Sequence, residues 1–257
     1  MSYLNAIILG IVQGLTEFLP VSSSGHLVLA EHFLNAKMPG VDFELVLHMG
    51  TLLSVLIYFR KQIFGLIKAL YSPAMIEERK MILYLILGTI PAGLAGFFLK
   101  DIFEEAFSSP VATSIFMLIT GVILLSTAVV KAGERKITWG RSLLIGVGQA
   151  VAIFPGISRS GTTISTGLFL RVKPIIAAEY SFLLSIPAIL GAIVLKSREI
   201  ASLNTVLMGP YLIGAIVSFI FGLMAVYLLL DIIRRGKFKY FGIYCLVMGA
   251  VALIHFL

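Results

Sequence analysis

The sequence predicts an all-α polytopic membrane protein, built as an inverted-topology repeat with six transmembrane helices and two re-entrant helical hairpins. Three observations predict it: long apolar runs, a polar motif that occurs twice, and a one-sided distribution of Lys and Arg. Hydrophobic residues make up 59% of the 257 residues and charged residues 13%. An average soluble domain is about half apolar and about a quarter charged. We therefore expect a single membrane domain over residues 1–257.

Six apolar runs have about the length that a helix needs to cross a bilayer, which is roughly 20 residues. They cover residues 43–59, 82–99, 111–130, 176–195, 208–230 and 240–257. The N-terminus lacks the basic region of a secretory signal peptide, so we do not expect a cleaved leader. The single cysteine, Cys245, excludes an intramolecular disulfide.

The polar motif occurs in residues 9–25 and again in residues 145–161, an offset of 145 minus 9, or 136 residues. Without a gap, both copies place a glutamine, a phenylalanine and a final Ser-x-Ser-Gly at the same positions. Three apolar runs follow each copy. The sequence thus divides into repeat one, 1–130, with a re-entrant hairpin at 3–36, and repeat two, 137–257, with a re-entrant hairpin at 140–172.

The distribution of basic residues distinguishes re-entrant hairpins from spanning ones. If both hairpins re-enter, one side of the membrane holds 15 Lys and Arg residues and the other holds four, with Arg159 inside a hairpin. If both hairpins span, the split is 11 to 8. The positive-inside rule favours the first arrangement. It places the loops 60–80, 131–141 and 231–239 in the cytoplasm and both termini on the external face.

Three spans separate equivalent points of the two repeats, and an odd number inverts the second copy, as in many transporters. The first hairpin then enters from outside and the second from inside. Irregular backbone at membrane depth is tolerated only where protein buries it or where it lines a wet cavity. We therefore expect the two hairpin tips to meet and to form a polar cavity.

In the first hairpin, Gln13 and Glu17 are four residues apart and share a helix face. Pro20 ends that helix. The serines that follow can cap the next helix, whose N-terminal amides form an anion site. These serines are Ser22, Ser23 and Ser24, and His26 follows them.

The second hairpin carries Arg159, whose guanidinium suits phosphate and whose position within the membrane makes it a functional candidate. Since Glu17 is the one carboxylate in either hairpin tip, we expect Glu17 to pair with Arg159. The candidate substrate-binding residues of this hairpin are Gly156, Ser158, Arg159, Ser160, Thr162 and Thr163.

Together the hairpins supply a carboxylate, an imidazole, hydroxyls, an arginine and two helix N-termini, which is the set that phosphoryl transfer needs. The sequence contains no Walker A, HExxH or CxxC pattern, so nucleotide hydrolysis and zinc chemistry lack support. The net charge of +7 lies mainly in short loops, so it indicates membrane orientation and not a nucleic-acid partner.

The motifs QGLTEFLPVSSSGHL (13–27) and PGISRSGTT (155–163), with FELVLHMGTLLSVLIYF (43–59), resemble the undecaprenyl-diphosphatase family, also called bacitracin-resistance proteins. The resemblance covers nearly the whole chain. It implies an integral enzyme of the bacterial plasma (inner) membrane that hydrolyses undecaprenyl diphosphate to undecaprenyl phosphate and needs a divalent cation, magnesium or calcium. The product is the lipid carrier of cell-wall synthesis. Membrane lipids are the other expected partners, and a homodimer is left open.

Carried over onto this chain, the resemblance implies that Gln13 and Glu17 hold the cation and that Arg159 binds the diphosphate. Many family members have Glu at the position of Gln13, so the cation site here has one charge fewer. Ser23 is the preferred nucleophile, with Glu17 or His26 as base. His26 as nucleophile or as acid for the leaving group, and direct attack by water, stay open.

Less reactive roles are also open to residues of these motifs. Ser22 and Ser24 are better candidates for helix caps or phosphate contacts than for nucleophiles. His48, inside an apolar run, is expected to form a hydrogen bond between helices. A second function, transport or flipping of a polyprenyl phosphate, is compatible with the inverted repeat. The sequence leaves open the membrane face to which the site opens, the prenyl length, the preferred metal and the oligomeric state.

Overall fold

The computed structural model describes residues 2–34, 41–107, 109–195 and 208–257, and this part of the chain is built from helices with one isolated bridge, Arg135 to Val172. The helices are α1 (Tyr3–Phe18), α2 (Ser23–Leu34), α3 (Val41–Tyr58), α4 (Arg60–Tyr71), α5 (Ile76–Phe98), α6 (Lys100–Phe107), α7 (Pro110–Ser126), the 3₁₀ helix η1 (Thr127–Val129), α8 (Trp139–Val151), α9 (Arg159–Phe169), α10 (Pro174–Leu195), α12 (Met208–Arg234) and α13 (Tyr240–Phe256).

Four helices in the described part of the chain, α5, α7 with η1, α10 and α12, are long and apolar enough to cross a membrane. A fifth span exists if α3 and α4 count as one bent pair, with an angle of 79° between them. The apolar α13 has 17 residues, which is at the short end of the length that spans a membrane. All six predicted runs therefore lie on helices, and the all-α polytopic class is confirmed.

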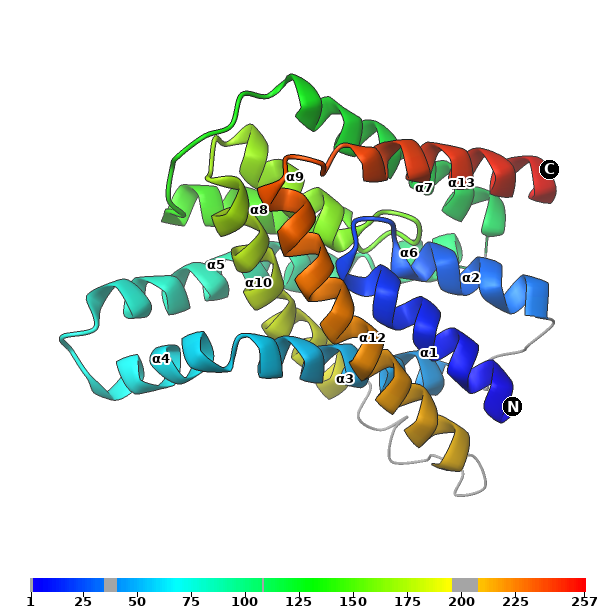
Figure 1. The fold of residues 1–257 in the computed structure, drawn as a ribbon, viewed down its shortest axis with the longest axis horizontal. Helices are drawn as coiled ribbons and strands as arrows, with labels where there is room; N and C mark the ends of the chain where they lie inside the picture. Colours follow the sequence, from blue (N-terminus) through cyan, green and yellow to red (C-terminus); the bar gives the residue numbers. More distant parts are fainter. Residues whose placement is uncertain (1, 35–40, 108, 196–207) are drawn as a thin grey trace.

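The predicted loop 60–80 contains a helix that the apolar runs did not reveal. α4 has the sequence RKQIFGLIKALY, in which apolar residues recur at Ile63, Phe64, Ile67 and Leu70. This spacing is that of an amphipathic helix. α4 packs on the start of α5, and the two helices project together from the body of the protein (Figure 1). The short amphipathic α6 was not predicted either.

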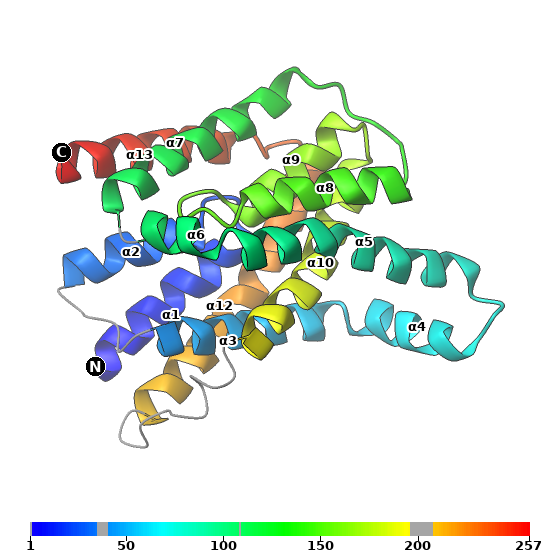
Figure 2. The same cartoon turned by 180° about the vertical axis from the view of Figure 1, so that it is seen from behind.

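In each of the two broken helix pairs, α1–α2 and α8–α9, the first helix packs on a long helix from the other half of the chain. α1 packs along α12, and α8 packs along α5. α7 and α13 pack on each other, as do α3 and α10 (Figures 1 and 2). Equivalent helices thus make equivalent contacts. The division into repeats at 1–130 and 137–257 stays a prediction.

Both termini lie at one end of the molecule, and the turn between α4 and α5 lies at the opposite end (Figures 1 and 2). This placement matches the even number of crossings that the sequence predicts.

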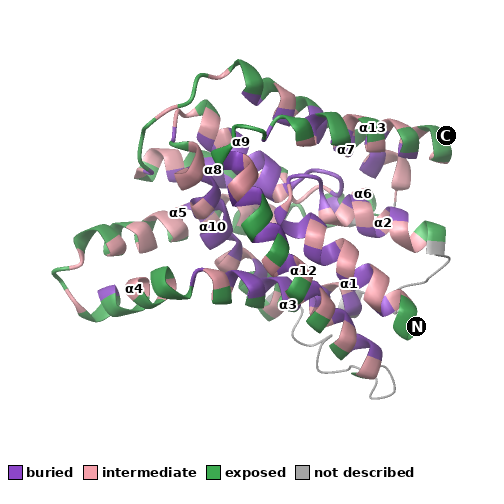
Figure 3. Ribbon diagram, in the orientation of Figure 1, coloured by how far each residue is buried: buried purple, intermediate pink, exposed green. Residues whose placement is uncertain are grey.

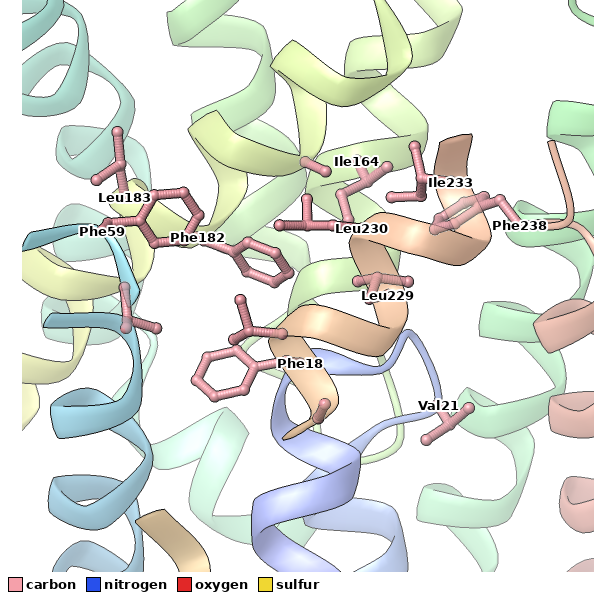
Figure 4. Packing of buried hydrophobic residues seen from close by; sticks show 14 of the residues in the cluster. Phe18, Val21, Phe59, Ile164, Phe182, Leu183, Leu229, Leu230, Ile233 and Phe238 are labelled. Carbon is pink, nitrogen blue, oxygen red and sulfur yellow. The ribbon is translucent and has the colours of Figure 1, made fainter. Parts of the chain in front are cut away.

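Burial is concentrated where the hairpin tips meet the long helices, whereas α4, the outer face of α5 and α13 are exposed (Figure 3). The largest hydrophobic cluster surrounds the end of α1 (Figure 4). There Phe18 packs edge-on against Phe182 of α10, with ring centroids 5.5 Å apart. Phe18 follows Glu17 directly, so this core fixes the backbone that carries the buried carboxylate.

Candidate active site

Glu17 lies at the centre of a polar cluster in which its two carboxylate oxygens have different partners. Gln13 Nε2 and Ser23 Oγ donate hydrogen bonds to Oε2, at 2.9 and 2.7 Å. Arg159 Nη2 donates to Oε1 in an ion pair. His48 Nε2 lies 3.5 Å from Oε2. The glutamate is only 7% exposed, so these groups supply the interactions that water would otherwise provide.

The turn after α1 brings Ser23 back to Glu17. α1 ends at Phe18, and Ser22 adopts a left-handed conformation with φ of 70°. Ser22 Oγ then accepts a hydrogen bond from Gly25 N at 3.2 Å. The predicted capping role of Ser22 is confirmed, and it places Ser23 at the first position of α2 with its hydroxyl on the carboxylate.

The second hairpin repeats this cap. Ser158 Oγ accepts from Gly161 N at 3.1 Å, and Thr162 N donates to the Ser158 carbonyl at 2.8 Å. Arg159 is therefore the first residue of α9, and its side chain extends to Glu17 of the first hairpin. The Glu17–Arg159 pair that the sequence predicts is confirmed.

The two tips are also joined through their backbones. Gly156 N donates to Ser24 Oγ at 3.3 Å, and Ser160 Oγ donates to the Leu19 carbonyl at 3.2 Å. The predicted meeting of the tips is thus confirmed. It brings together the N-termini of α2 and α9, where the first-turn amides that the serine caps leave without a partner favour an anion.

His26 is held apart from the carboxylate. Its Nδ1 lies 2.8 Å from the Ser22 carbonyl and its Nε2 lies 2.7 Å from the Tyr244 hydroxyl. The His26 and Tyr244 rings are also stacked, 5.6 Å apart. The structure therefore gives His26 a partner on α13, Tyr244, which the sequence did not suggest.

Several predicted substrate contacts already have partners within the protein. Thr162 Oγ1 donates to the Ser158 carbonyl, and Thr163 Oγ1 donates to the Arg159 carbonyl and bonds with Ser181 Oγ. The Gly156 amide is bound to Ser24. These groups shape the second hairpin, and Arg159 is its one side chain that bonds to the Glu17 cluster among the described contacts.

Two buried polar atoms at the cluster have no hydrogen-bond partner among the described residues: Arg159 Nη1 and Gln13 Oε1. Buried donors and acceptors are almost always paired, so each of these two atoms is a position for water or for a ligand. The free guanidinium nitrogen fits a phosphate oxygen. The free amide oxygen fits water or a hard cation.

A cation implied by the resemblance fits the donor set of the first hairpin. Glu17 supplies a carboxylate and Gln13 an unpartnered amide oxygen, the ligand types that Mg²⁺ and Ca²⁺ take. Within the described residues, no cluster holds three or more His, Cys, Asp or Glu side chains.

His48 belongs to this cluster, although the sequence did not predict it as a site residue. We expected it to join two helices through a hydrogen bond. His48 lies on α3 and its Nε2 faces Glu17 of α1, so the contact does link two helices, and its partner is the carboxylate of the site. The signal was present, because an ionisable residue within a membrane helix is a functional candidate by default.

Comparison with known proteins adds a family to this geometry. Residues 6–251 match the family described as "Bacitracin resistance protein BacA". A protein of Korarchaeum cryptofilum named undecaprenyl-diphosphatase is 43% identical, over 98% of this chain and 99% of the relative. A protein of the same name from Desulfatibacillum aliphaticivorans is 41% identical, over 99% of both chains.

Proposed function

Because this chain belongs to the bacitracin resistance protein BacA family, we propose that it is a membrane-embedded undecaprenyl-diphosphatase. It hydrolyses undecaprenyl diphosphate to undecaprenyl phosphate and inorganic phosphate, which returns the lipid carrier to cell-wall synthesis and confers bacitracin resistance. The observation that carries this proposal is the single cluster formed by Glu17, Ser23 and Arg159 from two hairpins.

The geometry supports Ser23 as the nucleophile and Glu17 as its base. Ser23 Oγ–H donates to Glu17 Oε2 at 2.7 Å, so Glu17 takes this proton as Ser23 attacks the terminal phosphorus. The phosphoanhydride bond breaks, and undecaprenyl phosphate leaves with the bridging oxygen. Water then attacks the phosphoserine while Glu17 returns its proton to the departing Ser23 Oγ, and both protons of the attacking water leave on the inorganic phosphate, so that the Glu17 carboxylate and the Ser23 hydroxyl are both regenerated.

Arg159 and the two helix N-termini bind the charge of the substrate. One guanidinium nitrogen holds Glu17, and the other is free for a phosphate oxygen. Phosphoryl transfer depends chiefly on positioning and on neutralising charge at these oxygens. The serines at the tips, Ser22, Ser24, Ser158 and Ser160, hold the two N-termini at one place.

His26 is assigned to the leaving group. Its contacts with the Ser22 carbonyl and Tyr244 keep it on the α2–α13 side, and no described contact links it to Ser23. A histidine placed there can donate a proton to the departing phosphate. The Glu17–Ser23 hydrogen bond therefore supports Glu17 in preference to His26 as the base.

Glu17 and Gln13 are the residues that would hold a magnesium or calcium ion. Such an ion would neutralise negative charge on the phosphate oxygens of the substrate. Since Gln13 is neutral, Glu17 supplies the formal charge of this pair.

We also propose the plasma membrane as the location, with both termini on the external face, as the distribution of basic loops indicates. A homodimer remains a proposal, and a nucleic-acid partner is not expected.

A second candidate function is translocation of the polyprenyl phosphate, and it rests on the packing of each hairpin against the other half of the chain. α1 packs along α12, and α8 packs along α5. In transporters with inverted repeats, one repeat moves as a rigid body against the other. The hydroxyl–carboxylate pair at the site favours hydrolysis, because a carrier needs no nucleophile.

The test is phosphate release from undecaprenyl diphosphate by the protein purified in detergent, with magnesium or calcium and with a chelator. We expect cation-dependent release that Glu17→Ala and Arg159→Ala both abolish, while Glu17→Ala still binds the lipid. If folded wild-type protein releases no phosphate, hydrolysis is refuted and translocation in vesicles becomes the function to measure.

A further inference from the structure

We propose that His48 is a third protein ligand of the cation site at Gln13 and Glu17, and that this site therefore takes a nitrogen-accepting divalent cation such as Mn²⁺ in preference to Mg²⁺ or Ca²⁺. The inference rests on the proposed function, because it concerns the cation that would act at the diphosphate.

The separation of the donor atoms fits one ion. His48 Nε2 lies 3.5 Å from Glu17 Oε2. Two ligands at roughly 2.1 Å from one metal lie about 3.0 Å apart at a right angle and about 3.4 Å apart at a tetrahedral angle. The observed separation is therefore close to the spacing of two donor atoms on a shared ion.

The orientation of the ring is that of a metal ligand. His48 Nδ1 lies 2.8 Å from the carbonyl oxygen of Glu44, one turn earlier in α3. In a neutral imidazole, a hydrogen bond from Nδ1–H to this carbonyl leaves the lone pair on Nε2, which faces the carboxylate. Histidine ligands almost always donate their other ring N–H to a carbonyl or carboxylate in this way.

Two electron-rich atoms that face each other need a positive charge between them, which is either a proton on His48 Nε2 or a metal cation. His26 shows the alternative: its Nδ1 also contacts a backbone carbonyl, but its Nε2 meets the Tyr244 hydroxyl. His48 Nε2 instead faces Glu17 Oε2. A metal cation satisfies both atoms. The Gln13 amide, whose Nε2 donates to Glu17 Oε2 in this structure, supplies the third donor when it turns its unpartnered Oε1 to the ion.

The three donors come from two packed helices and leave coordination positions open. Gln13 and Glu17 lie one turn apart on α1, and His48 faces them from α3, which packs on α1. The His48 side chain is 24% exposed and that of Glu17 is 5% exposed. Three protein ligands leave the remaining positions for phosphate oxygens or water.

The donor types select the metal. Carboxylate and amide oxygens suit Mg²⁺, Ca²⁺ and Mn²⁺, whereas imidazole suits transition metals. A site with two oxygen donors and one nitrogen donor therefore favours Mn²⁺ over the two alkaline-earth ions. Mg²⁺ in particular keeps its water and prefers oxygen.

The experiment uses the full chain, purified free of metal in detergent and loaded with one equivalent of Mn²⁺. Pulsed electron paramagnetic resonance detects a coordinated histidine through the nuclear modulation of its nitrogen. We expect this modulation in the wild type and its loss in His48→Gln. Competition binding should show a Mn²⁺-to-Mg²⁺ affinity ratio at least ~10-fold lower in this variant.

His32→Gln is the matched control, because His32 lies at the far end of α2, beside His255. It should leave both the modulation and the affinity ratio unchanged. His26→Gln should also leave the modulation intact. Modulation that persists in His48→Gln, or that vanishes in His26→Gln instead, overturns the proposal, as does a wild type that binds no Mn²⁺ or binds it without modulation.

Phosphate release measured in parallel separates this inference from the proposed function. If His48 binds Mn²⁺ but the protein releases no phosphate, the diphosphatase proposal fails and the cation site stands. If phosphate is released while His48 shows no coupling, the ligand assignment alone fails.

Discussion

The buried pair of Glu17 and Arg159 determines both the position of the base and the junction of the hairpins. A carboxylate taken out of water is costly unless a positive charge and hydrogen bonds replace its hydration. Arg159, Ser23 and Gln13 provide them here. Removal of either charge should therefore damage the fold as well as the chemistry.

We expect Glu17→Gln and Arg159→Gln each to lower the free energy of unfolding by about 3–5 kcal/mol, because each leaves a buried charge without its partner. The double variant should lose clearly less than the two changes added together, since no unpaired charge remains. Denaturant unfolding in detergent measures this. Glu134→Gln, at the exposed Lys173–Glu134 pair, is the control, and strict additivity would contradict the coupling.

Tyr244 should position His26. Tyr244→Phe keeps the stacked ring but removes the hydroxyl that lies 2.7 Å from His26 Nε2. One hydrogen bond contributes about 1 kcal/mol, so we expect kcat to fall about 5–10-fold with KM unchanged. Steady-state phosphate release provides the measurement, with Tyr240→Phe on the same helix as control. An unchanged kcat would show that Tyr244 does not position His26.

At the scale of elements, each hairpin depends on a turn that one residue makes possible. Gly156 has φ of 97°, a conformation that side chains with a Cβ avoid. A Cβ there would lie 2.2 Å from the Thr113 carbonyl of α7. The close approach lets Thr120 donate to the Gly156 carbonyl at 2.9 Å.

We therefore expect Gly156→Ala to destabilise the protein by more than the roughly 1–2 kcal/mol that a left-handed residue costs, because α7 must also shift. A lower melting temperature in detergent and reduced phosphate release should accompany it. Gly65→Ala in α4 is the matched control: its added methyl meets no atom within 4 Å, and it should be neutral or slightly stabilising. Equal melting temperatures for Gly156→Ala and Gly65→Ala would contradict the predicted strain at Gly156.

α5 is the spanning helix that the rest of the protein covers least. Only 6% of its apolar stretch is buried inside the protein, against 50% for α10. The exposed side chains include Leu83, Ile86, Ile90 and Leu94. Lipid chains should therefore contact this face. In vesicles, lipid-soluble oxygen should raise the relaxation rate of a spin label attached at Ile90→Cys. It should leave the relaxation rate of a label at Ile145→Cys on α8 unchanged. Protection at Ile90 would indicate a second copy on this face.

For the whole molecule, the two halves are interlocked: the first helix of each hairpin packs on a long helix of the other half. Both termini lie at one end, away from the α4–α5 turn (Figure 1). The basic loops then decide which end faces the cytoplasm.

A thiol-labelling experiment checks this orientation. We expect a membrane-impermeant maleimide to label Leu257→Cys in intact cells and to reach Ala132→Cys only after the membrane is opened. Both positions are exposed, and the native Cys245 is buried, so it should contribute little background. The opposite pattern would invert the proposed topology.

The sequence by itself determined the membrane class, the repeated motif and the pairing of Glu17 with Arg159. Each depends on local information: apolar length, spacing along one helix, and the scarcity of charges at membrane depth. The amphipathic α4 was also encoded in its 3.6-residue period, but the run of charges around it indicated only a loop.

Tertiary packing alone decided which histidine meets the carboxylate. His48 reaches Glu17 because α3 packs on α1, and His26 bonds with Tyr244, 218 residues away, because α13 lies beside α2. No periodicity encodes a contact between residues so far apart. Such contacts follow from how the helices bury their faces, and this physical step separates the residues that the sequence indicates from the site that they form.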